Sequence, residues 1–259
     1  MADGLPPVSS LGPAARHYAG RDDADSQTSP PEVSAGLERW LSQVGDVSPL
    51  LDVGCGVGSN LELMRARGLS VIGSEISRPA AVAARRSAPV AVADGMRLPF
   101  ADGAFGAAVC TEVLEHVDDP RVVFAEMQRV LRPGAFAYVT APNYANLAGL
   151  HKWWADRRTG RHDWNPWGAH EGGYEAFMTG RRLAAAAARH FEVLSVRGLD
   201  YGQALTGRFP TLDRLATQAT VNRGVTRFLE LLYRRAGDPV IRWHGMHVEL
   251  TLRRRAARG

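Results

Sequence analysis

Cysteine is scarce in this chain, which argues against a disulfide-stabilised secreted domain. The 259 residues include only two cysteines, Cys55 and Cys110, and both lie in segments that we expect to be buried strand ends. Small secreted domains are dense in cysteine because disulfides replace a large apolar core. The low cysteine content therefore favours a reducing compartment, and we expect a cytoplasmic protein.

Long apolar runs are also missing. Nowhere do about eighteen apolar residues follow one another, the minimum for a membrane-spanning helix. Residues 1–15 contain Pro and Gly where a signal peptide needs its apolar stretch. We therefore expect neither a membrane span nor a membrane partner.

Lysine is nearly absent. Lys152 is the only one, so almost all of the 31 basic residues are arginine, and they face 27 acidic residues for a formal net charge of +4. So small an excess is ordinary for a solvated surface, and the basic cluster at 253–258 is read as a tail. We expect no nucleic-acid partner, although the basic balance leaves an RNA or protein substrate as an alternative.

The apolar pattern that is present predicts an α/β fold. Short apolar runs alternate with stretches of helical periodicity, which is typical of parallel strands joined by helices in a doubly wound sheet. Predicted strands cover 50–53, 71–75, 90–93, 107–111, 136–140, 191–196 and 247–252. Predicted helices cover 32–44, 60–67, 78–87, 120–131 and 180–189, with one or two more within 212–235.

Three regions interrupt this pattern. Residues 1–30 are rich in Pro, Ser, Asp and Gly and are expected to be partly disordered, with Tyr18 as a candidate exception. Residues 31–259 are expected to form a single domain with insertions at about 143–180 and 199–246. The first insertion holds Trp153, Trp154, Trp164 and Trp167, and loops of this length are usually functional.

The residues from 50 to 60, LLDVGCGVGSN, predict a buried strand that enters a glycine-rich turn and then a helix. Glycines let the backbone turn sharply and let a ligand approach it closely. The dinucleotide fingerprint needs a glycine where this chain has Ser59, so the spacing here is G-x-G-x-G. The turn alone therefore indicates a ligand site without identifying the ligand.

Two further strands end in carboxylates. Glu75 closes the strand at 71–75, about twenty residues after the glycine turn, where a ribose diol is held in related folds. Asp94 follows the next strand, where it could accept from an adenine amino group while Met96 covers the ring. A solvated strand end is the alternative interpretation of Glu75.

The order of these motifs resembles class I S-adenosylmethionine-dependent methyltransferases, particularly the group related to ubiquinone-type O-methyltransferases. The resemblance covers residues 50–143 and includes LPFADGAF at 98–105, CTEVLEHV at 110–117 and RVLRPG at 129–134. It implies a doubly wound, seven-stranded, mostly parallel sheet. It also implies S-adenosylmethionine as cofactor, S-adenosylhomocysteine as product and a small organic acceptor, with a hydroxyl oxygen as the favoured atom.

The same resemblance implies a set of cofactor-binding residues. Those at the methionine end are Asp52, Gly54, Cys55, Gly56 and Asn60, with Thr111 beside the sulfonium. Glu75 takes the ribose, and Asp94, Gly95 and Met96 take the adenine. Ile76 and Glu112 complete the set. Glu75 stands where many members of the group have Asp, which lengthens the reach by one methylene.

Methyl transfer requires positioning of the acceptor and, for a hydroxyl, removal of its proton. His116 is the first candidate for the base and His170 the second. Glu112, Glu115 and His116 also form an E-x-x-E-H arrangement that holds a divalent metal in some relatives, and at helical spacing Glu112 would share a face with Glu115 or His116. We expect no metal ion at this site, but the arrangement leaves metal binding as an open alternative.

The acceptor pocket is expected to be built from the segment around Tyr18 and from the two insertions. The tryptophans at 153–167 would then form a lid; their alternative role is a locally packed core. A non-catalytic module that binds the cofactor is the remaining alternative, and the oligomeric state is open.

Overall fold

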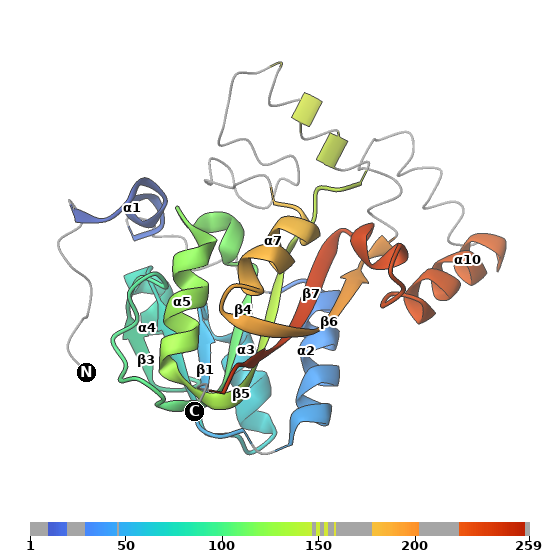
Figure 1. Ribbon diagram of the computed structural model, residues 1–259. Coiled ribbons are helices and arrows are strands. Elements are labelled where there is room, and N and C mark those ends of the chain that lie inside the picture. Colours follow the sequence, from blue (N-terminus) through green and yellow to red (C-terminus); the bar gives the residue numbers. More distant parts are fainter. Residues whose placement is uncertain are drawn as a thin grey trace.

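The chain folds around one seven-stranded sheet, shown as arrows in Figure 1. The computed structural model describes residues 10–19, 29–45, 47–146, 149–150, 153–154, 158, 178–201 and 223–256. The strands are β1 (Leu50–Val53), β2 (Val71–Glu75), β3 (Val90–Val92), β4 (Phe105–Thr111), β5 (Leu131–Pro142), β6 (Phe191–Leu199) and β7 (His247–Arg254). The helices are α1 (Pro13–Ala19), α2 (Pro31–Val44), α3 (Ser59–Ala66), α4 (Arg78–Ala84), α5 (Pro120–Val130), α7 (Gly180–Ala187) and α10 (Arg223–Arg234), with single 3₁₀ turns η2 (Leu114–His116) and η3 (Ile241–Trp243).

The strand order confirms the predicted doubly wound, mostly parallel sheet. It runs β3-β2-β1-β4-β5-β7-β6, and β7 is antiparallel to both of its neighbours. Because β7 runs against β5, its first residue, His247, pairs with Pro142 at the end of β5. The start of β7 therefore lies at the edge of the sheet where β1, β2, β4 and β5 end, which is the edge where ligands bind in such folds.

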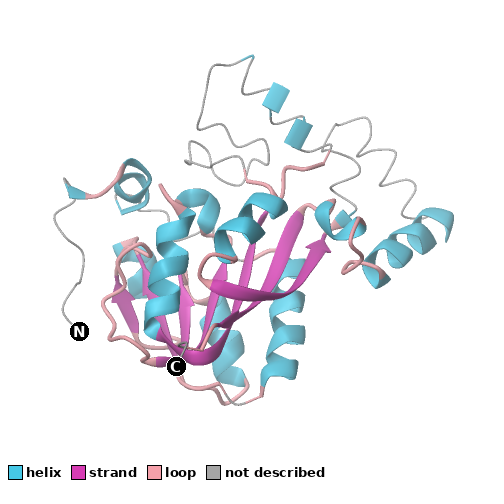
Figure 2. Cartoon of the chain, in the orientation of Figure 1, coloured by secondary structure: helices cyan, strands magenta, loops and turns pink. Residues whose placement is uncertain are grey.

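Helices cover both faces of the sheet, as Figure 2 shows. On one face, α5 and α7 contribute Phe124, Met127 and Leu183 to the core. On the other face, α2 and α3 contribute residues such as Trp40 and Met64. Strands covered on both faces have no need to alternate, and all four residues of β1 are buried.

The predicted elements agree with the structure at their centres and differ at some ends. The helix predicted at 78–87 ends at Ala84, and the strand predicted at 136–140 runs from Leu131 to Pro142. This strand is longer because it begins directly where α5 ends. Residues 13–19, within the segment expected to be partly disordered, form helix α1, in which Tyr18 is buried.

Much of the two predicted insertions, including Trp164, Trp167 and His170, lies outside the described residues. Cys55 and Cys110 are buried free thiols. Among the helices that the structure describes, none has both the length and the apolar character needed to cross a bilayer.

Candidate cofactor and active site

The glycine turn after β1 depends on backbone conformations that side chains rarely adopt. Gly54 and Gly58 have φ values of +71° and +98°. A Cβ on Gly54 would also lie 2.3 Å from Cγ2 of Val113, which closes the space above the turn. The turn therefore needs glycine at position 54 for two separate reasons, and the bare backbone there forms part of a pocket wall.

Glu75 connects this turn to the end of β2. Its Oε2 accepts a hydrogen bond of 2.9 Å from the Gly56 amide, and its Oε1 accepts one of 2.8 Å from the Ser77 amide. Burial raises the pKa of the Glu75 carboxyl, while these two N–H donors act in the opposite direction. The carboxylate is thus fixed in orientation at the pocket edge, as a group that binds a diol must be.

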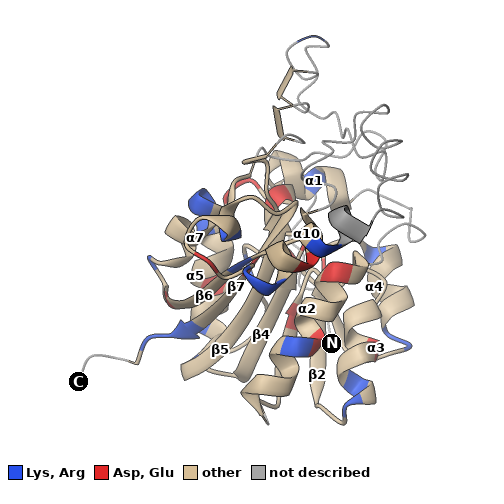
Figure 3. Cartoon of the chain, turned by 90° about the vertical axis from the view of Figure 1, so that its right-hand side faces the viewer, with Lys and Arg blue, Asp and Glu red and all other residues tan. Residues whose placement is uncertain are grey.

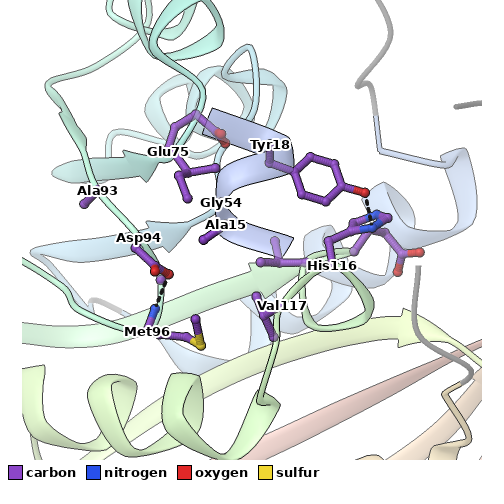
Figure 4. Close-up of a pocket in the computed structure, with 13 residues that line it drawn as sticks. Ala15, Tyr18, Gly54, Glu75, Ala93, Asp94, Met96, His116 and Val117 are labelled. Carbon is purple, nitrogen blue, oxygen red and sulfur yellow. Dashed lines mark hydrogen bonds between the residues drawn. The ribbon is translucent and has the colours of Figure 1, made fainter. Parts of the chain in front are cut away.

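Asp94 occupies the corresponding position after β3. Its Oδ1 accepts a hydrogen bond of 2.8 Å from the amide of Met96, the residue after Gly95. Burial raises the pKa of Asp94 despite this contact. The Asp94 carboxyl and the Met96 side chain consequently lie side by side at one end of the pocket (Figure 4).

Asp52 is the least satisfied polar group near the site. Its side chain is fully buried in β1, and neither carboxylate oxygen has a hydrogen-bond partner among the described residues. Burial, and then repulsion from Glu75, raise the pKa of Asp52 to about 8. A buried carboxyl without a partner is costly, and a cationic ligand group would offset that cost.

These elements line a pocket with an empty volume of about 620 Å³, which includes space open to solvent. Helix α1 covers one side of it with Ala15 and Tyr18, which are labelled in Figure 4. The pocket brings together eight of the predicted site residues: Gly54, Glu75, Ile76, Asp94, Gly95, Met96, Glu112 and His116.

Five other predicted residues are not among those that line the pocket. One of them, Gly56, donates its amide hydrogen to Glu75. Asn60, in the first turn of α3, donates a hydrogen bond of 2.8 Å through Nδ2 to Oγ1 of Thr111 at the end of β4. Asp52 lies within the sheet, and Cys55 is buried in the core against α3 and β2. Asn60 and Thr111 therefore join α3 to the end of β4, at the expected methionine end of the cofactor.

His116 takes part in holding α1 over the pocket. Its Nδ1 and the Tyr18 hydroxyl form a hydrogen bond of 2.7 Å, while its Nε2 lies 3.7 Å from Oε1 of the buried Glu115. A second contact fixes the same helix, since the Ala14 amide donates to Oδ1 of Asp118 at 3.1 Å. His116 thus lines the pocket, but its Nδ1 is already engaged. His170, the second predicted base, lies outside the described residues.

The prediction that Glu112 shares a helical face with Glu115 or His116 is wrong. Only residues 114–116 form a helical turn, a single 3₁₀ turn, and Glu112 lies before it with a φ of +54°. Glu112 therefore contacts Thr140 and His247, whereas Glu115 lies beside His116. Within the described part of the chain, no three His, Cys, Asp or Glu side chains are grouped to hold a metal ion.

Several pocket residues carried no signal in the sequence. Ala15, Ala93, Val113 and Val117 line the pocket with apolar atoms that resemble any core residue. Thr140 and His247 reach Glu112 from β5 and β7, far along the chain. The alternating pattern of the last strand located His247 at its start, but nothing local indicated its partner.

Comparison with known proteins identifies the fold and the domain. Residues 51–139 match the family described as "Methyltransferase domain". The chain is 36% identical over 114 residues to a ubiquinone biosynthesis O-methyltransferase of Pseudomonas paraeruginosa, covering 40% of this chain and 49% of that protein. It is 37% identical over 131 residues to the methyltransferase GfsG of Streptomyces halstedii, covering 46% and 47%.

The chain spans about half the length of these curated relatives. Among solved structures, the geranyl diphosphate C-methyltransferase of Streptomyces coelicolor A3(2) superposes with a TM-score of 0.59 at 17% identity, over 98% of this chain and all of that one. At this identity the superposition shows a common fold.

The residues present fit S-adenosylmethionine, the cofactor of this family. The turn at Gly54 leaves bare backbone, and the Glu75 carboxyl is fixed for a diol. The Asp52 carboxyl has no partner among the described residues and its pKa is raised to about 8 by burial, so a cationic methionine end would stabilise its ionised form. Residues 51–139 therefore form a methyltransferase domain, and the geometry of the pocket fits the class I, S-adenosylmethionine-dependent type.

Proposed function

We propose that this protein transfers the methyl group of S-adenosylmethionine to a hydroxyl oxygen of a small organic acceptor in the cytoplasm. The observation that carries the proposal is the single pocket wall that runs from Asp94 and Glu75 to Glu112 and His116. Its first part suits a cofactor, and its second part offers groups that can take or share a proton. The relative named as a ubiquinone biosynthesis O-methyltransferase supports oxygen as the acceptor atom.

The bound cofactor supplies a methyl group activated by a positively charged sulfur. Glu75 and Asp94 orient the adenosine part, and the glycine turn allows close approach of the methionine part. Helix α1 covers the pocket, held by Tyr18 and Ala14, and excludes water from the site. What the protein contributes is chiefly orientation of acceptor and methyl group, with proton removal as a second effect.

An RNA or protein substrate is the second candidate, and one local feature favours it. Arg65, Arg78, Arg85 and Arg86 surround an open hollow on α3 and α4. On the other elements in Figure 3, basic residues are mixed with acidic ones, so this concentration of arginines is confined to one part of the surface. Replacing Arg78 and Arg86 by Gln would abolish transfer to a macromolecule and leave transfer to a small acceptor unchanged.

Product analysis tests the proposal. The purified protein would be incubated with S-adenosylmethionine carrying a deuterated methyl group and a panel of catechol, 3,4-dihydroxybenzoate, 1-octanol and tryptamine. We expect mass spectrometry to find the label on oxygen. Label on the tryptamine nitrogen alone would contradict oxygen as the acceptor. Saturable S-adenosylhomocysteine binding without transfer to these probes or to cell-extract metabolites would instead support a non-catalytic module.

A further inference from the structure

Glu112 is held in an unusual conformation by contacts from two neighbouring strands. Its φ of +54° is rare for a residue with a side chain. Its amide donates to the Thr140 carbonyl at 3.2 Å, and its Oε1 accepts from the Thr140 hydroxyl at 2.7 Å. Its Oε2 lies 3.3 Å from Nε2 of His247. Strained residues fixed by several contacts are concentrated at functional sites.

The three residues differ in what they face. Glu112 lines the pocket, whereas Thr140 is fully buried behind it. The His247 side chain is 12% exposed, and its Nδ1 is buried with no hydrogen-bond partner among the described residues. Leaving a buried ring nitrogen unpaired costs stability, so the position of His247 is explained better by what its other nitrogen does for Glu112.

The position of His247 is itself rigidly built. Asn143, at the end of β5, donates through Nδ2 to the carbonyls of Trp243 and Gly245, at 2.8 and 2.9 Å. Its amide donates to the Met246 carbonyl at 2.7 Å. These bonds join the chain just before β7 to the end of β5, and so fix the imidazole beside Glu112.

His116 is less suited to receive a proton. Its Nδ1 is engaged by the Tyr18 hydroxyl, and its Nε2 is directed at the Glu115 side chain. Removing a proton from an acceptor would require His116 to release one of these contacts. Glu112 keeps its contacts to Thr140 and His247 while presenting a carboxylate to the pocket.

We propose that Glu112 takes the proton of the acceptor hydroxyl and that Thr140 and His247 are positioning residues for its carboxylate, an inference that rests on the proposed function. The acceptor O–H bond breaks and its proton passes to Glu112 as the acceptor oxygen bonds to the methyl carbon. The methyl–sulfur bond breaks and its electron pair stays on sulfur. The carboxylate loses its negative charge as the sulfonium loses its positive charge, so the step is balanced.

The test compares Glu112→Gln, Thr140→Val, His247→Gln and His247→Ala with two exposed controls, Glu192→Gln and His244→Gln. The acceptor is whichever compound of the panel above the wild-type protein methylates. On it, Glu112→Gln should lower kcat by about 100-fold, which is a typical effect of losing a general base. Its S-adenosylhomocysteine affinity should stay within about threefold, because the Glu112 side chain is bound to Thr140 and His247 and a base for the acceptor replaces the cofactor-binding role first expected of it. Unchanged kcat, or affinity falling in parallel with kcat, would overturn the proposal.

The positioning residues have their own signature. Thr140→Val and His247→Ala should lower kcat by about tenfold with little change in KM, since only the orientation of the carboxylate is lost. His247→Gln keeps an N–H donor and should recover part of that loss. Equal losses in His247→Gln and His247→Ala would remove His247 from this role.

A measurement without turnover separates this inference from the proposed function. In ¹⁵N-histidine spectra of the full chain with S-adenosylhomocysteine, at alkaline pH, the neutral His247 ring should carry its proton on Nε2. A proton on Nδ1 would rule out the proposed donation from His247 Nε2 to Glu112, even if methyl transfer to oxygen is found. If the wild type labels only tryptamine, oxygen specificity fails, and the same variants assayed on that amine still decide whether Glu112 is the base.

Discussion

The two ends of the sheet differ in how their chemistry is encoded. The cofactor half, from β1 to β4, takes its polar groups from strand ends and the residues just after them, such as Glu75 at the end of β2 and Asp94 shortly after β3. The proposed acceptor half brings together Glu112, just after β4, with Thr140 of β5 and His247 of β7 through side-chain contacts. A fixed cofactor site can therefore be joined to an acceptor site that changes with the insertions, which is how one fold serves many substrates.

The largest expected effect comes from the first insertion. Its ends are already joined, since the Tyr144 amide donates to the Met178 carbonyl at 2.9 Å and the Gly180 amide to Oδ1 of Asn143 at 3.0 Å. A short Gly/Ser linker in place of 153–170 should therefore leave the sheet intact. We expect methyl transfer to be lost while S-adenosylhomocysteine affinity changes by no more than a few-fold. Loss of both, with a lower Tm, would show that the tryptophans are core.

A second variant breaks the cofactor half instead. Gly54→Ala and Gly45→Ala both place a side chain at a φ of +71°, but only at Gly54 does the new Cβ meet Val113. Each should lose about 1–3 kcal/mol of unfolding free energy, because side chains rarely adopt these positive-φ conformations. Only Gly54→Ala should also weaken S-adenosylhomocysteine binding, by about tenfold or more, because the new Cβ displaces the pocket wall at Val113. Equal affinities in the two variants would exclude the turn from the site.

Glu75→Gln tests the ribose position. It keeps the size of the side chain and removes its charge, so S-adenosylhomocysteine should bind about 1–3 kcal/mol more weakly. Glu62→Gln, on the exposed surface of α3, is the matched control. Calorimetric affinities that agree for both variants and the wild type would remove Glu75 from the cofactor site.

Asp52 should make stability depend on pH. Its pKa rises from 3.8 to about 8 on folding, so between these values the folded state holds a proton that the unfolded state has released. The unfolding free energy should therefore fall as pH rises, by about 1.4 kcal/mol per pH unit from this group. The effect should level off above about pH 8. Asp52→Asn should flatten this slope in denaturant titrations of the ligand-free protein, and an unchanged slope would assign it to other groups.

The same contrast decides what could be predicted from the sequence. The glycine turn, Glu75 and Asp94 were predictable because each follows an apolar run whose end sets its position. The contacts of Glu112 were not, because its positive φ turns the side chain away from the helical face that E-x-x-E-H suggests. The Tyr18–His116 hydrogen bond likewise joins residues about a hundred positions apart, which no local pattern encodes.

Titration calorimetry of the wild-type chain with S-adenosylhomocysteine directly tests whether residues from β1 to β4 form a complete S-adenosylmethionine site. We expect saturable binding at one ligand per chain and no saturable binding of NAD⁺, since Ser59 replaces the glycine that a dinucleotide turn requires. Absence of saturable S-adenosylhomocysteine binding, or equally tight binding of NAD⁺, would contradict the claim.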